Sequence, residues 1–139
     1  VGQAYIAGFS GAISDRVKAD VGKALGDGGS VVRIGGKTRY LTAIAIAKEV
    51  KGAGHNLSDP RNQSVSIVTG KNFADALSLA PLAGVAGAPL FLTERADCLP
   101  AEVGAALQAK GDFPHDHRLS AGGNGVVSDA VINDLTVCQ

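Results

Sequence analysis

The chain has 139 residues, of which 45% are hydrophobic but only 4% aromatic, and 19 of them are glycine. This length and composition suit one compact domain whose core is built from small aliphatic side chains. Thirteen basic residues balance thirteen acidic ones, and no stretch supplies about 18 uncharged apolar residues, so the sequence predicts neither a nucleic-acid partner nor a membrane partner.

Five short runs of aliphatic or β-branched residues predict strands. Nearly every run is followed by glycine and then by a helical pattern, so the repeating unit is strand, turn, helix. A continuous apolar run is typical of a strand that is covered on both faces, which favours a parallel sheet. The predicted strands span residues 4–7, 31–34, 65–69, 89–92 and 118–121. We therefore predict an α/β fold: a single three-layer domain with a mostly parallel, Rossmann-like sheet of about five strands flanked by helices.

Helical patterns fill the spaces between these strands. Thr38 is placed to cap a helix whose apolar positions recur every three or four residues. The helix after the third strand begins at Lys71 or Asn72, and Pro81 is expected to bend or end it. The polar, turn-rich segment 52–64 predicts a surface loop.

Two glycine-rich loops, AGFSGAIS and AGGNGVVS, each follow a strand and precede a helix. Backbone N–H groups at such a place attract anions, but neither loop has the GxGxxG spacing or the lysine of GxxxxGK[ST], so nucleotide binding is the weaker interpretation. The favoured interpretation is structural. Glycine permits the turn, Ser14 and Ser128 cap the helices, and Asp15 and Asp129 complement the helix dipoles.

A repeat at a constant offset of 114 residues relates the two ends of the chain. Residues 6–21 match residues 120–135 without a gap, with Ala, Gly, Gly, Ser, Asp, Val and Asp at equivalent places. A repeat of this length predicts a tandem array. We expect residues 1–32 to be the tail strand and helix of a preceding repeat, packed with a module formed by residues 33–139.

Two groups of side chains invite a catalytic or metal-binding interpretation. Asp75 lies in the turn after a strand, where a carboxylate can act as a general base, but no partner is evident and a role at the helix start is favoured. His115 and His117 flank an aspartate, and on a strand both imidazoles would point to one side, but no third ligand is near. No GxSxG motif is present. The sequence therefore predicts no cofactor, no metal site and no covalent catalysis.

Cys98 and Cys138 are the only cysteines, and their spacing matches no zinc or CxxC pattern. In a reducing cytosol they would be buried thiols. Outside the cell they would form a bridge that closes a long loop and stabilises the fold by about 4 kcal/mol. Both interpretations stay open from the sequence, and the bridge is favoured.

Several short motifs follow one another in a specific order: RIGGKTRYLTAIAIAKEV, then GKNFADALSLAPLAGVAGAPLFLT, then SAGGNGVVSDAV. Their order and spacing resemble the second type of cell-wall-binding repeat of Gram-positive surface proteins, over residues 33 to about 135. The matching elements are Arg33-Ile34, Gly36, Arg39-Tyr40, Thr42-Ala43, Ile46-Ala47, Phe73-Ala74-Asp75-Ala76-Leu77-Ser78, Pro81-Leu82-Ala83 and Ala88-Pro89.

The resemblance implies a non-catalytic module that anchors an extracellular protein to the cell wall without covalent bonds. The implied ligand is an anionic cell-wall polysaccharide or teichoic-type polymer, and the implied fold is Toprim-like. Family members carry tandem repeats that associate with pseudo-threefold symmetry. We therefore expect a secreted protein of the cell wall or cell surface, with S-layer-like anchoring, whose copies form a homotrimer or pack against neighbouring repeats.

The resemblance also implies part of a binding site. The family has a Pro-Ile-Leu-Leu stretch that is proposed to lie at the polymer site. It corresponds here to Pro89, Leu90, Phe91 and Leu92, so phenylalanine stands at an aliphatic place.

Four cations give an independent route to a binding site. In open parallel sheets the ligand crevice lies beyond the carboxyl ends of the strands. Lys37 and Arg39 follow one predicted strand, Lys71 follows another and Arg95 a third. Arginine pairs bidentately with phosphate or carboxylate and lysine supplies a compact charge, so we expect these side chains to contact the polymer. The alternative for Arg39 and Lys71 is that each is a solvent-exposed side chain at the start of a helix, with no role in binding.

A peptidoglycan hydrolase (amidase) or a domain that modifies such a hydrolase is the alternative function, because repeats of this family often accompany amidases or proteases. A Toprim-like enzyme is a third hypothesis. It would need a metal-binding glutamate with a DxD pair, and the local candidates Asp112 and Asp116 are wrongly spaced. The chain is therefore predicted not to be an enzyme.

Overall fold

Strands and helices alternate along the whole chain. The computed structural model describes residues 2–52, 64–109, 113 and 116–139, so most of the predicted surface loop, together with Asp112 and His115, lies outside the described residues. The elements are β1 (Gln3–Ala7), α1 (Asp15–Leu25), β2 (Ser30–Ile34), α2 (Arg39–Gly52), β3 (Ser64–Thr69), α3 (Phe73–Val85), β4 (Leu90–Thr93), α4 (Ala101–Gln108), β5 (His117–Ser120) and α5 (Asp129–Asp134). The five predicted strands are confirmed, each within one residue at either end.

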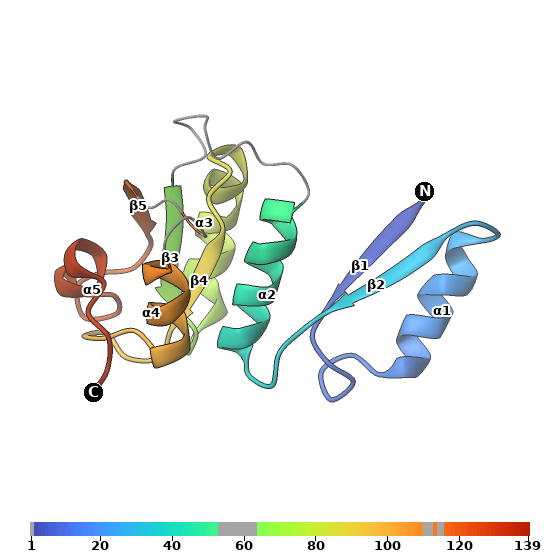
Figure 1. Cartoon of the computed structure of the whole chain (residues 1–139), viewed down its shortest axis with the longest axis horizontal. Helices are drawn as coiled ribbons and strands as arrows, with labels where there is room; N and C mark the ends of the chain where they lie inside the picture. The colour runs from blue at the N-terminus through green and yellow to red at the C-terminus, as the bar shows by residue number, and fades with distance from the viewer. Residues whose placement is uncertain (1, 53–63, 110–112, 114–115) are drawn as a thin grey trace.

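The prediction of one sheet of about five strands is wrong, because the strands form two separate parallel sheets. β1 pairs with β2 from Gln3↔Ser30 to Ala7↔Ile34, and the second sheet has the order β4-β3-β5. The chain leaves β2 and enters α2, which packs against β4. The unit made by β1, α1 and β2 therefore stands to one side of the three-stranded sheet, as Figure 1 shows.

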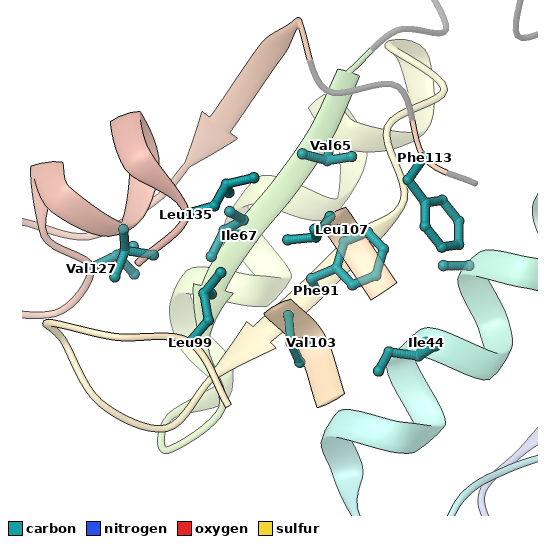
Figure 2. Packing of buried hydrophobic residues seen from close by; sticks show 12 residues of the cluster. Ile44, Val65, Ile67, Phe91, Leu99, Val103, Leu107, Phe113, Val127 and Leu135 are labelled. Carbon is teal, nitrogen blue, oxygen red and sulfur yellow. The ribbon is translucent and has the colours of Figure 1, made fainter. Parts of the chain in front are cut away.

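The three-stranded sheet is covered on both faces, which confirms the layered α/β prediction. α3 packs on one face, while α2, α4 and α5 contribute to the core on the other face (Figure 1). Odd-numbered residues of β3, Val65 and Ile67, point into this core with Phe91 of β4, whose ring packs edge-on against Phe113 at 5.1 Å between centroids (Figure 2). Both faces of β3 are buried, as its continuous apolar run predicts.

The predicted helix caps are confirmed. Val17 N donates to Ser14 Oγ and Val131 N to Ser128 Oγ, and Leu41 N donates to Thr38 Oγ1. Each cap satisfies one of the N–H groups that the first turn of a helix leaves without a partner.

Pro81 does not end its helix. α3 begins after the cap residue Asn72 and continues to Val85, four residues beyond the proline. Proline has no N–H group to donate, so one carbonyl group in the preceding turn loses its helical partner. Pro81 is exposed, so that carbonyl group lies close to water.

The C-terminal end is tied to the body of the domain. Cys98 and Cys138 form a disulfide across 40 positions of sequence, which confirms the favoured prediction. Beside it, Leu99 N donates to Thr136 O and Cys138 N donates to Leu99 O. None of the described helices is both long enough and apolar enough to span a bilayer.

Candidate functional site

The carboxyl ends of β3 and β4 lie side by side, and two of the predicted cations, Lys71 and Arg39, start from this edge or reach its backbone. Thr69 pairs with Thr93, and Gly70 N donates to Thr93 O at 2.7 Å. Lys71 follows this position directly, and Arg39 reaches it from the start of α2, where its Nη1 donates to the carbonyl oxygen of Gly70. Both cationic side chains are exposed. The helix start therefore holds the Arg39 guanidinium at the backbone of Gly70, the residue before Lys71.

Gly70 allows this close approach. A Cβ atom at this position would lie 3.0 Å from Cε1 of Tyr40 and 3.3 Å from Cδ of Arg39. Such contacts are tighter than an ordinary van der Waals contact, so a larger residue would push the start of α2 away from β3. Gly70 thus determines where the Arg39 side chain lies.

An open hollow of about 880 Å³ lies between the turn after β1, helices α2 and α3, and the start of β4. Its walls are mainly alanine, glycine and aliphatic side chains. Among the described residues that line it, two are cations and none is a carboxylate. Five of the eight residues predicted to bind the polymer line this hollow: Lys37, Arg39, Pro89, Leu90 and Leu92.

Phe91 lies elsewhere. Its side chain is 0% exposed and belongs to the core, because neighbouring residues of a strand point to opposite faces of the sheet. Leu90 and Leu92 face the hollow and Phe91 faces α4. Any effect of Phe91 on binding would therefore act through the position of β4.

A second, smaller hollow of about 290 Å³ holds Lys71. It also contains Asp75 and Glu94, so the charges that line it are mixed. Asp75 is half-buried at the start of α3, and its Oδ2 would lie 3.0 Å from a Cβ placed on Gly122, whose φ is +102°. The carboxylate thus packs against the turn after β5, which agrees with the favoured structural role of Asp75.

Arg95 is engaged by a neighbouring carboxylate. Its Nε and Nη2 each donate to Asp97 at 2.9 Å, in the parallel two-bond geometry that arginine forms with carboxylates. The hydrogen bond from Arg95 holds the pKa of Asp97 below its usual range. The positive charge predicted to contact the polymer is therefore paired in this structure.

Tyr40 lies among charged groups at the same end of the sheet. Burial, with a smaller contribution from the negative charge of Glu94, raises its pKa above the usual value. The phenol therefore stays neutral at physiological pH and is no candidate nucleophile. In the described part of the chain no group of three His, Cys, Asp or Glu side chains is placed to hold a metal ion, and His117 is an exposed residue of β5.

The unit formed by β1, α1 and β2 supplies one wall of the large hollow, which the sequence did not predict. Gly35 passes so close to the turn after β1 that a Cβ on it would lie 2.9 Å from Cδ1 of Phe9 and 3.0 Å from the carbonyl carbon of Gly8. The only signal in the sequence was the repeat, which placed a glycine turn at the N-terminal end without saying where it would pack.

Helix α3, which begins with the motif Phe-Ala-Asp-Ala-Leu, also places apolar side chains at the surface. Phe73 is 76% exposed, Leu77 65% and Val85 89%, all on α3. All three side chains are therefore largely open to solvent in the described part of the chain. The expected association with neighbouring repeats remains a prediction, and these side chains of α3 form one apolar surface that is open to it.

Comparison with known proteins gives one family. The pattern of Cell wall binding domain 2 (CWB2) matches residues 33–132. Two proteins of Bacillus subtilis (strain 168) are similar in sequence: an amidase enhancer, 38% identical over 84 residues, and N-acetylmuramoyl-L-alanine amidase LytC, 34% identical over 106 residues. These matches cover 60% and 76% of the chain but only 10% and 19% of those proteins.

Two solved structures from Clostridium difficile share the fold. Cwp6 has a TM-score of 0.73 at 26% identity and covers 91% of the chain, and Cwp8 has a TM-score of 0.66 at 25% identity and covers 97%. The chain corresponds to 18% and 20% of those two proteins. In each comparison it is similar to one part of a much longer protein.

Proposed function

The chain belongs to the cell wall binding domain 2 family, and on this basis we propose that it is a non-catalytic module that anchors an extracellular protein to the cell wall by binding an anionic wall polymer. The polymer would be a polysaccharide or a teichoic-type chain that carries phosphate or carboxylate groups. The protein would be secreted and held at the wall or cell surface.

One observation carries this proposal. The large hollow is lined both by the stretch at the start of β4, which the family resemblance implied, and by the cations Lys37 and Arg39, which strand geometry predicted. Its described lining contains positively charged side chains and no negatively charged ones. A volume of about 880 Å³ lies within the usual range of ligand sites. Apolar walls suit the carbon faces of sugar rings, while Lys37 and Arg39 suit anionic substituents.

Replacement of Arg39 by alanine is expected to weaken retention on purified wall polymer by about tenfold, because one charge-assisted contact is lost, and the effect should be larger at low salt. Lys48→Ala is the matched control, since Lys48 is an exposed cation of the same helix that does not line the hollow. Retention is measured by co-sedimentation after a thermal melt has shown that both variants are folded. Equal retention of the two variants would remove Arg39 from the site.

Replacement of Asp97 by asparagine is expected to strengthen retention by about two- to threefold, because it removes the negative charge that is paired with the Arg95 guanidinium, and exposed ion pairs contribute little. The pKa of Asp97 is lowered, so its carboxylate stays negatively charged and paired with Arg95 until the pH falls to that lowered pKa. The gain in retention is therefore expected across the neutral pH range. Asp20→Asn, which removes another exposed paired carboxylate, is the control. Unchanged binding in both variants would place Arg95 outside the site.

The alternative is that the chain acts on peptidoglycan or modifies an enzyme that does. The similar proteins named as an amidase and an amidase enhancer favour this only weakly, because the chain matches a tenth to a fifth of their length. We propose that catalysis, where it accompanies this module, lies in other parts of such proteins. Incubation of the purified chain with purified wall separates the two functions: saturable, salt-sensitive binding without soluble product supports adhesion, and released muropeptides support the alternative.

The disulfide supports the proposed location. Disulfides persist in oxidising surroundings and are rare in a reducing cytosol. Cys98 and Cys138 are joined, so the folded module suits the exterior of the cell.

A further inference from the structure

One aromatic side chain lines the large hollow. Phe9 lies in the turn after β1, and 48% of this residue is exposed. A single exposed apolar residue is common on protein surfaces, but this one belongs to a concave site. No other aromatic residue is part of the described lining. Any contact between the hollow and an aromatic ring therefore depends on Phe9.

The surroundings of Phe9 hold its ring in place. The carbonyl oxygen of Phe9 accepts from Ala12 N at 2.9 Å and from Ile13 N at 3.1 Å, which closes the turn. On one side the ring lies against Gly35, where an added Cβ would come within 2.9 Å of Cδ1 of Phe9. Because the main chain already fixes the position of the ring, a ligand that packs on it pays little for ordering it.

The turn itself does not need the phenylalanine ring. In the turn after β5, which is related to this one by the offset of 114 residues, Gly123 stands at the place of Phe9. Its carbonyl oxygen accepts from Val126 N at 2.8 Å and from Val127 N at 3.1 Å, in the same pattern. The same turn thus forms without any side chain at this position, so local folding does not explain the ring of Phe9.

Positive charge lies close to the ring. Lys37 comes two residues after Gly35, so the Cα atoms of these two residues are at most about 7 Å apart. Arg39 follows at the start of α2, and both cationic side chains are exposed and line the hollow. The hollow therefore presents an aromatic ring and two cations on one concave surface. This combination suits a ligand that has both a rigid apolar face and an anionic group.

A charged pyranose sugar has both features. The C–H groups on one side of a pyranose ring form an apolar face with a slight positive charge, and the face of an aromatic ring is slightly negative, so the two stack. A linear polyol phosphate carries anions and hydroxyl groups but has no rigid apolar face, and its flexible chain loses more conformational freedom on binding. The ring of Phe9 therefore favours the pyranose sugar.

We propose that Phe9 is a stacking platform for a sugar ring, and that the polymer bound in the large hollow is an anionic polysaccharide of pyranose sugars and not a linear polyol phosphate. One ring stacks on Phe9 while an anionic group of the same or the next sugar contacts Lys37 or Arg39. This inference rests on the proposed function, because it assigns the ligand class of the same hollow. Phe9 lies outside residues 33–132, which match the family.

The chain contains no tryptophan, so Phe9→Trp places a single fluorescent reporter at the hollow and keeps an aromatic ring there. An anionic pyranose polysaccharide purified from Gram-positive envelopes is expected to shift the emission to shorter wavelength, because a stacked sugar displaces water from the indole. Tyr5→Trp is the control, since Tyr5 is 51% exposed on β1 but does not line the hollow. Poly(glycerol phosphate), which has charge but no rings, should leave the emission of both variants unchanged. Equal shifts with the two polymers would contradict the pyranose assignment.

Phe9→Leu separates the aromatic ring from apolar bulk. It is expected to weaken retention on the same polysaccharide by about five- to tenfold, whereas Phe9→Trp should keep it, and a thermal melt checks that both variants are folded. Full retention of Phe9→Leu together with loss in Arg39→Ala would overturn the stacking platform and leave wall binding intact. If the unchanged chain itself is not retained on any wall polymer, the proposed function fails and this inference fails with it.

Discussion

Replacement of Phe91 by alanine is expected to lower the free energy of unfolding by about 4 kcal/mol. Phe91 is the largest fully buried side chain of the core, where it contacts residues of α2, α4 and the edge-on ring of Phe113. Its loss removes buried apolar area, an aromatic pair worth about 1 kcal/mol, and the support of β4 from one side. Chemical denaturation of the variant and the unchanged chain measures the difference.

Phe91→Leu separates packing from binding. Leucine fills most of the same volume, so its cost is expected to be about 1 kcal/mol, and retention on wall polymer should match that of the unchanged chain. Leu90→Ala alters the neighbouring side chain that lines the hollow, and it is expected to reduce retention at a smaller cost in stability. Strong loss of binding in folded Phe91→Leu would show that the position of β4 at the hollow depends on the phenylalanine ring itself.

Replacement of both Cys98 and Cys138 by serine is expected to cost about 4 kcal/mol in the free energy of unfolding, which corresponds to a fall of roughly 15 °C in the melting temperature. The bridge closes a loop of 40 positions that contains α4, β5 and α5, and its loss restores conformational freedom mainly to the unfolded chain. Thermal unfolding followed by circular dichroism measures the change.

Reduction of the unmodified chain is the control for the serine variant. If loop closure is the cause, the reduced chain and the double variant should melt within a few degrees of each other, and the variant should not respond to reductant. The hydrogen bonds between Leu99 and residues 136–138 would then hold the C-terminal end alone. An unchanged melting temperature in both samples would show that the bridge contributes little stability.

The strands and caps were predictable because their causes are local. A continuous apolar run such as β3 indicates a strand covered on both faces, and Ser14, Thr38 and Ser128 cap helices through atoms two or three residues away. Which strands pair is decided by contacts between distant residues. The sequence therefore predicted five strands correctly but placed them in one sheet, whereas α2 packs against β4 and β2 pairs only with β1 among the described strands.

The candidate site was predictable in part for the same reason. Neighbouring residues of a strand point to opposite faces, so Phe91 must lie on the other face of β4 from Leu90 and Leu92. The sequence does not show which of the two faces is turned to the core. The pairing of Arg95 with Asp97 spans only two positions, so it is a local contact that the sequence could have indicated. The contribution of Gly8 and Phe9 to the hollow depends on how the N-terminal unit packs, and no local pattern encodes that.

Co-sedimentation of the folded chain with purified Gram-positive envelopes, before and after acid extraction of their anionic glycopolymer, tests the central claim most directly. The account predicts saturable, salt-sensitive binding to intact envelopes and its loss after extraction, with no soluble product released. Failure to bind intact envelopes, or equal binding to extracted ones, would contradict it.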